Sequence, residues 1–298
     1  MDSFADERDC DLLGQDRYTF FVLRRIIRGD CRLLLTDHRS LIICYTGHPY
    51  PVWIWTADGA SAETMEYAYR LAAEHALLQE GCRFNVKYEL AEYLIRRAAE
   101  DGRKLSVVTN MFAYDCPDPI QPAVTADGAI HRCTEEDLGE VTEFLDLIHR
   151  EIGIDQKDTA GYRADAEKMI ASGKMYFWRN RQGKHVASCK YAPDGDMAAV
   201  NLVFTRPEYR RMHYAENLVF RVTRIAKEEG FLPMLYTDAD YTASNACYEK
   251  IGYAFLFCRI FTRIPGLNSG RLILYCDKAD FNIALCHLFN KSHKILSP

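Results

Sequence analysis

The feature that most restricts the fold of this chain is an apolar run that leads through a proline and two arginines into an amphipathic helix. Val200 to Thr205 has the composition of a strand, and apolar residues recur at helical spacing from about Tyr214 onward. The connection between them contains Pro207, Arg210 and Arg211. The first N–H groups of a helix have no partner within the helix, and they lie at the positive end of its dipole. The connection therefore predicts an anion-binding loop where the strand passes into the helix.

The second half of the chain alternates strand-like and helix-like segments around this loop. The expected strands are Ile130–Thr134, Met175–Arg179, Val186–Tyr191, Met197–Thr205, Met234–Thr237 and Tyr253–Phe261. The first expected helix carries apolar residues from Leu138 to Ile148 on one face. The other expected helices run near Ala164–Ala171, from about His213 to Glu229, and over Ser244–Ile251. The order βααβββαβαβ predicts one domain with a mixed sheet and flanking helices.

The loop and this element order resemble the GNAT acyl-CoA N-acetyltransferases, whose pyrophosphate loop reads Arg/Gln-x-x-Gly-x-Gly/Ala. Arg210 and Ala215 fit that pattern, and His213 stands where the family has its first glycine. Histidine adopts positive φ less reluctantly than most side chains, and its ring N–H is able to contact phosphate. The resemblance covers about residues 130–263.

The resemblance implies an α+β fold of the GNAT type, with a mixed, centrally splayed sheet, acetyl-CoA as co-substrate and no metal. It assigns Tyr248 as the general acid that protonates the departing thiolate, and Asn245 as a contact of the pantetheine arm. The implied cofactor-binding residues are Leu202, Val203, Phe204, Thr205, Arg210, Arg211, Met212, His213, Tyr214, Ala215, Asn245 and Tyr248.

The general base and the activity itself are less determined by the sequence. Glu208 lies beside the phosphate loop, and Asp238 and Asp240 follow the end of a strand, so each is a candidate to accept the proton of the amine. The main expectation is an N-acetyltransferase in which a primary amine attacks acetyl-CoA directly in a ternary complex. The alternative is a catalytically inactive CoA-binding or interaction protein whose phosphate loop is obstructed by His213.

Four regions are expected along the chain. Residues 1–115 form an N-terminal α+β domain, and 116–128, with three prolines, form a linker. Residues 129–264 form the acetyltransferase domain. Residues 265–298 form a C-terminal extension, which either covers a sheet edge or meets a second copy in a homodimer.

The first of these regions reads as a small domain with three strands, two helices and a final strand. A short helix over Asp16–Arg28 precedes them. The expected strands are Arg32–Leu35, Leu41–Tyr45, Val52–Thr56 and Leu105–Thr109, with helices over Ala62–Gln79 and Glu89–Glu100. Trp53 and Trp55 share one face of a strand, where a core position is favoured over a pocket.

Composition excludes several other classes of protein. Residues 1–128 carry a net charge of −6 and residues 129–298 a net charge of +1, so a basic nucleic-acid surface is not expected. No apolar run is long enough to span a membrane, and eleven scattered cysteines indicate neither disulfides nor zinc knuckles, which together predict a cytoplasmic protein. The histidines, among them His131, His149, His185 and His213, show no metal-binding spacing. The acceptor, a small-molecule or peptide amine, is left open.

Overall fold

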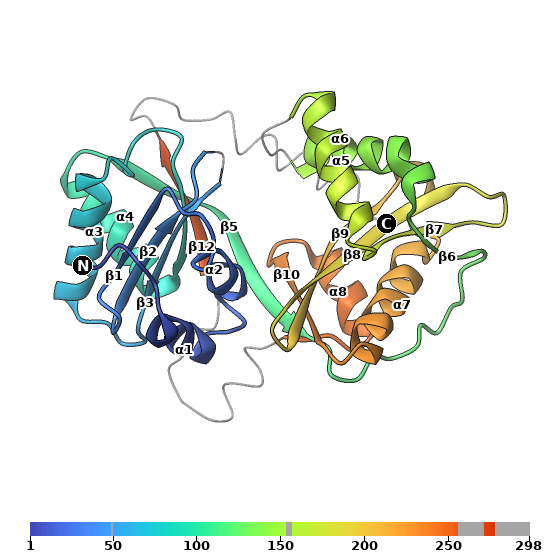
Figure 1. Ribbon diagram of the computed structural model, residues 1–298, viewed down its shortest axis with the longest axis horizontal. Helices are drawn as coiled ribbons and strands as arrows, with labels where there is room; N and C mark the ends of the chain where they lie inside the picture. Colours follow the sequence, from blue (N-terminus) through green and yellow to red (C-terminus); the bar gives the residue numbers. More distant parts are fainter. Residues whose placement is uncertain (49, 153–156, 256–270, 278–298) are drawn as a thin grey trace. The chain divides into compact units, whose positions relative to one another are not determined.

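The computed structural model describes residues 1–48, 50–152, 157–255 and 271–277, and these fall into two compact units (Figure 1). The first unit contains Met1–Ala113, Thr237–Ala243 and the described C-terminal residues. The second contains Tyr114–Tyr236 and Ser244–Phe255. Both units are mixed α+β structures, which confirms the fold class expected from the sequence. No helix in the described residues has the length and apolar character that a membrane span requires.

The first unit is built on a mixed sheet with helices on both faces. Its strands are β1 (Leu33–Thr36), β2 (Leu41–Tyr45), β3 (Val52–Thr56), β4 (Arg83–Lys87), β12 (Arg271–Asp277) and β5 (Lys104–Asp115), in that spatial order. Its helices are α1 (Glu7–Gln15), α2 (Phe21–Ile26), α3 (Ala62–Glu74) and α4 (Tyr88–Glu100). Among its described pairings, β3 and β4 are parallel and the others are antiparallel.

The two faces of this sheet bury alternate residues of the same strands. Ile43 and Ile54 pack with α3 and α4, whereas Trp53 and Trp55 pack with α1 and α2. Side chains alternate across a strand, so one apolar strand supplies both cores. Trp53 and Trp55 are 5% and 2% exposed, which confirms their prediction as core residues.

Two sequence predictions for this unit are wrong. The helix expected over 16–28 is replaced by α1 and α2, because Asp6 caps α1 early and Asp16 leaves the helix to bind Trp55 Nε1 and Lys87 Nζ at 2.6 Å each. Strand β4 was not expected, because its arginine, asparagine and lysine make it look like a loop. Lys87 is buried there through its ion pairs with Asp16 and Asp58.

The second unit has a mixed sheet in the order β10-β9-β8-β7-β6. The strands are β6 (Ala129–Arg132), β7 (Met175–Arg179), β8 (His185–Asp194), β9 (Met197–Thr205), β10 (Leu232–Asp238) and β11 (Ala254–Phe255). The helices are α5 (Leu138–Ile152), α6 (Thr159–Ala171), α7 (Tyr214–Glu228) and α8 (Thr242–Lys250). Strands β6 to β9 are antiparallel, and β9 and β10 are parallel. Strand β11 pairs with the end of β5.

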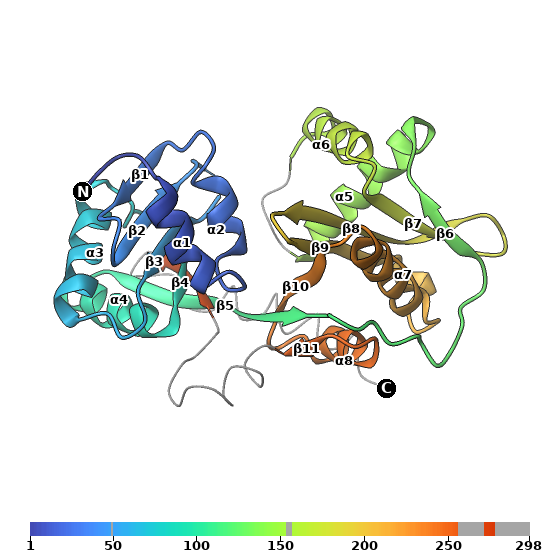
Figure 2. The ribbon, with the colours of Figure 1, turned by 60° about the horizontal axis from the view of Figure 1, so that its bottom comes forward.

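Helices α5 and α6 cover one face of this sheet and α7 covers the other (Figure 2). Phe177 packs into the apolar cluster of α5 and α6, and the next residue, Trp178, lies with Phe220 of α7. Each helix therefore uses the alternate side chains of β7, as expected for a sheet buried on both faces.

Residues 116–128, expected as a linker, follow the surface of the second unit. The Ile120 N–H donates to the Ile251 carbonyl at 2.9 Å, and Trp178 Nε1 donates to the Asp127 carbonyl at 2.7 Å. Strand β12 belongs to the C-terminal extension expected over 265–298, and it lies between β4 and β5 rather than at a sheet edge. The end of the strand expected over 253–261 lies outside the described residues.

Candidate functional site

Strands β9 and β10 run in parallel and then separate. Their described pairing joins Met197–Ala199 to Leu232–Met234 and stops there. Beyond it, Val200–Thr205 has no partner on this side among the described pairings, although both strands continue. The sheet therefore opens toward the carboxyl ends of two parallel strands, where α/β sheets usually bind ligands. This opening confirms the centrally splayed sheet that the resemblance implied.

A β-bulge in β9 lies at the start of the opening. Ser188 pairs with Phe204 and Lys190 with Asn201, so Cys189 faces two residues, Leu202 and Val203, on β9. Leu202 has a φ of 51°, which a leucine rarely adopts. The buried Ser188 donates its hydroxyl hydrogen to the Leu202 carbonyl at 2.9 Å and holds this conformation. A bulge of this kind redirects the backbone groups that follow it.

The loop after β9 turns sharply at two left-handed residues. A 3-10 turn over Pro207–Tyr209 is followed by extended Arg210, and then Arg211 and His213 have φ values of 62° and 61°. His213 is thus in the conformation for which a glycine is usually required, and it adopts it as the N-cap of α7. Left-handed residues in a tight turn can direct successive N–H groups into a concavity, which suits an anion.

The N-terminus of α7 has no side-chain cap, so its first N–H groups are left for another partner. The Asn217 N–H already bonds the His213 carbonyl, and the Asn217 side chain donates to the same carbonyl and to that of Val124, both at 2.9 Å. Tyr214 donates its hydroxyl hydrogen to Asp127 at 2.5 Å. Residues 116–128 therefore fix the start of the helix, a role that their proline content did not indicate.

The arginines around the loop are held by carboxylates of α5. Arg206 bonds both oxygens of Glu143, at 2.8 and 3.0 Å. Arg210 donates to the Thr205 carbonyl at 3.1 Å and pairs with Glu151. The Arg211 side chain is exposed. The Arg210 side chain therefore holds the loop to α5.

Helix α8 carries the two polar residues expected to complete the site. Asn245 is buried, and the Tyr248 ring packs edge-on against Tyr253 at 5.9 Å. Burial raises the pKa of Tyr248, and the Cys247 and Cys189 thiols raise it further. Within the described residues this hydroxyl forms no hydrogen bond, and it remains protonated at neutral pH.

Comparison with protein families matches part of this unit. The model described as "Acetyltransferase (GNAT) family" matches residues 141–253, which include β9, the loop, α7 and α8. The chain carries a GNAT acetyltransferase domain. A search of curated proteins found no match.

Solved structures show the same fold at low sequence identity. An "Acetyltransferase from GNAT family" from Colwellia psychrerythraea has a TM-score of 0.56 at 11% identity, covering 93% of this chain and 99% of that one. "GCN5-related" N-acetyltransferases from Kribbella flavida and Sphaerobacter thermophilus have TM-scores of 0.57 and 0.58 at 14% and 11% identity. They cover 89% and 91% of this chain, and 95% and 91% of their own chains. The similarity thus extends beyond the GNAT domain to the first unit.

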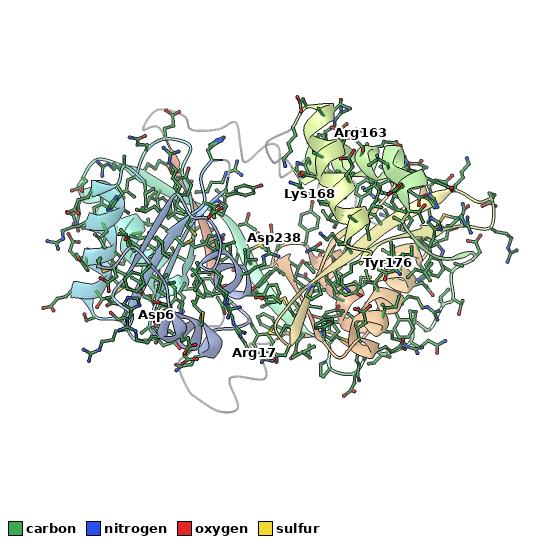
Figure 3. All side chains as sticks on the ribbon, viewed as in Figure 1. Asp6, Arg17, Arg163, Lys168, Tyr176 and Asp238 are labelled. Carbon is green, nitrogen blue, oxygen red and sulfur yellow. The ribbon has the colours of Figure 1, made fainter. Side chains whose placement is uncertain are left out.

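The carboxylates proposed as bases occupy different surroundings. Glu208 is exposed on the 3-10 turn and forms no hydrogen bond or ion pair within the described residues. Asp238, labelled in Figure 3, ends β10, and burial raises its pKa. Its carboxylate accepts the Asp240 N–H at 3.1 Å.

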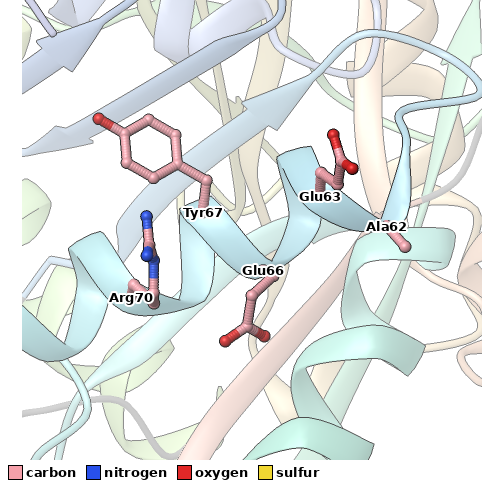
Figure 4. Close-up of a pocket in the computed structure, with 5 residues that line it drawn as sticks. All are labelled: Ala62, Glu63, Glu66, Tyr67 and Arg70. Carbon is pink, nitrogen blue, oxygen red and sulfur yellow. The ribbon is translucent and has the colours of Figure 1, made fainter.

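Two cavities lie away from the GNAT loop. One, of 420 Å³, is a shallow depression on α3 lined by Ala62, Glu63, Glu66, Tyr67 and Arg70 (Figure 4). The other, of 270 Å³, lies between residues 121–130, Trp178 and α7. Neither includes any of the residues predicted to bind cofactor or to act in catalysis.

Proposed function

We propose that the GNAT domain transfers an acetyl group from acetyl-CoA to a primary amine. The observation that carries the proposal is the opening between β9 and β10, which is continuous in sequence with an uncapped helix N-terminus and a loop containing two left-handed residues. An extended thioester with a diphosphate at one end needs both features. In this proposal the loop binds the diphosphate and the open edge of β9 binds the thioester arm.

The main chain of Arg211–Ala215 would bind the pyrophosphate, since Tyr214 and Ala215 begin a helix that has no side-chain cap and lie at the positive end of the α7 dipole. Backbone groups of Leu202–Thr205 would hold the pantetheine arm and the thioester carbonyl, since they have no strand partner on the open side among the described pairings. Asn245 would contact the same arm from α8. The Arg211 side chain would add positive charge to the loop.

The proposed reaction is direct attack within a ternary complex. The amine nitrogen forms a bond to the thioester carbon, the C–S bond breaks, and the electron pair leaves with sulfur. Tyr248 then gives its proton to the thiolate, a role that suits a phenol whose pKa is raised by burial and whose hydroxyl forms no hydrogen bond within the described residues. Glu208 and Asp238 are the two candidates to take the ammonium proton, either directly or through water, and no residue of the protein is acetylated.

The acceptor belongs to the small amines, amino acids or peptide amines, and the reaction is proposed to take place in the cytoplasm. The described cysteines are all free thiols, which fits a reducing compartment. The proposal is tested by incubating the full chain with acetyl-CoA and a panel of amines, while a thiol reagent detects released CoA. Amine-dependent release is expected, and it should fall in the Tyr248→Phe variant.

The same assay addresses the inactive alternative. Binding of acetyl-CoA without thiol release across the panel would favour a CoA-binding protein that lacks catalysis. The absence of binding at millimolar acetyl-CoA would overturn the proposal altogether.

A further inference from the structure

We propose that His131, Asp137 and His185 of the second unit bind a divalent transition-metal ion of the Zn²⁺ class. One ring nitrogen of each histidine and one carboxylate oxygen of Asp137 lie within 4.8 Å of one another. The three residues come from β6, the 3-10 turn that precedes α5, and β8, so only the fold brings them together. Their spacing in the sequence gave no sign of a metal site.

His185 carries the observation that points to a ligand. Its side chain is 10% exposed, and its Nδ1 lies 2.7 Å from the Glu140 carboxylate. Its Nε2 is buried and has no hydrogen-bond partner within the described residues. With Nδ1–H donating to Glu140, Nε2 carries a lone pair. In this tautomer Nε2 is able to bind a metal, and a carboxylate accepts the hydrogen bond of the other ring nitrogen, as is usual for metal-binding histidines.

His131 and Asp137 provide the other two ligands. His131 Nε2 lies 2.9 Å from Asp137 Oδ2, and the His131 ring stacks on that of His185 with centroids 4.8 Å apart. Asp137 is held in place by the Thr134 N–H at 2.7 Å, which bonds Oδ2. Asp137 Oδ1 forms no hydrogen bond within the described residues. The Thr134 N–H therefore orients the carboxylate through Oδ2, and the proposal assigns Oδ1 to the ion.

The ligand set selects the class of ion. Two imidazoles and one carboxylate suit Zn²⁺, whereas Ca²⁺ and Mg²⁺ prefer sites built of oxygen. Ligand bonds of about 2.0–2.2 Å place the donors of a tetrahedral Zn²⁺ roughly 3.3 Å apart, so a modest rotation of the side chains closes the cluster on the ion. Water would occupy the fourth position.

The proposed site is next to the phosphate loop. Arg206, which follows β9, donates from Nε to the His185 carbonyl at 3.2 Å and from Nη2 to Glu140 at 3.5 Å. A bound ion would therefore join β6, α5 and β8 just where the loop begins. Ion binding would make this corner of the GNAT domain more resistant to unfolding.

A second cluster in the first unit, formed by Asp6, Asp9 and His38, provides a matched control. There the carboxylates already serve the α1 capping box, and Asp9 also accepts hydrogen bonds from Thr36 and lies 2.7 Å from His38 Nδ1. No buried nitrogen is left without a partner at His38. The two clusters differ in the feature on which the proposal depends.

The test is titration of the tag-free full chain with Zn²⁺ against a chromophoric chelator, together with Co²⁺ absorption spectra. One Zn²⁺ per chain is expected to bind with micromolar or tighter affinity, and Co²⁺ is expected to give the visible bands of tetrahedral coordination. His185→Gln should weaken Zn²⁺ binding by at least tenfold, whereas His38→Gln should leave it unchanged. Circular dichroism establishes that each variant is folded.

Should His185→Gln fail to fold, Glu140→Gln decides, because loss of the carboxylate that bonds His185 Nδ1 is expected to weaken metal binding by roughly 10-fold or more. The proposal would be overturned if the unaltered chain did not bind Zn²⁺ stoichiometrically. Full affinity in the folded His185→Gln or Glu140→Gln variant, or loss of affinity in the His38→Gln variant, would also overturn it.

Discussion

Replacing His213 by glycine and by alanine separates what its backbone does from what its ring does. His213 has a φ of 61°, a conformation that costs a residue with a Cβ about 1–2 kcal/mol. The glycine variant removes this cost but gains about 0.4–1 kcal/mol of chain entropy in the unfolded state. The alanine variant keeps the cost. Both lose the contact between His213 and Glu216 at 3.1 Å, worth about 0.2–1 kcal/mol at a partly exposed site.

The expected result is that His213→Gly is more stable than His213→Ala by about 0.5–1 kcal/mol. Urea unfolding measures this difference in stability, and Trp178 serves as the probe of the second unit. CoA affinity by calorimetry should change by no more than about threefold in either variant, or about 0.7 kcal/mol, because the main chain binds the diphosphate. Equal stabilities would refute the left-handed conformation. A tenfold loss of affinity in both variants would show that the ring binds phosphate, which would refute the main-chain site.

Three other changes test parts of the site. Tyr248→Phe should lower kcat of acetyl transfer by about 10²-fold or more with acetyl-CoA affinity nearly unchanged, and an unaltered kcat would remove the general acid. Ser188→Ala removes the hydrogen bond to the Leu202 carbonyl, so it should reduce the free energy of unfolding by about 1–2 kcal/mol and raise KM for acetyl-CoA. No change in either quantity would show that the bulge holds without this bond. The hydrogen bond from Tyr214 holds the Asp127 pKa below its usual value, so this carboxylate stabilises the fold above a pH of about 4 and loses that effect as pH falls. Asp127→Asn should therefore destabilise the chain in urea at pH 7 but much less at pH 3, and an equal effect at both would contradict the assignment.

The GNAT domain was largely predictable from the sequence because its elements are set by local patterns. Strand β9 and helix α7 agree with their expected ranges to within a residue, since an apolar run, a proline and helical spacing are all local signals. The left-handed conformation of His213 followed from its place in a glycine motif. In the first unit, β4 was missed because Lys87 is buried only through Asp16 and Asp58, which are distant in sequence.

The parts of the site that could not be predicted depend on long-range packing. Asp127 and Val124 brace α7 although they lie about ninety residues before it. His131 and His185 meet only because β6 and β8 both pair with β7. Nothing in the residues near Ser188 indicates that its hydroxyl would hold a bulge on the next strand. Such contacts require the strand register, which a single sequence does not supply.

The most direct test of the central claim is amide hydrogen exchange of the full chain with and without CoA. The N–H groups of Tyr214–Glu216 have no side-chain cap and should exchange rapidly in the free protein. Saturating CoA should slow exchange in this segment and in Val200–Thr205. Binding that leaves both segments unprotected and protects another part of the chain would contradict the account.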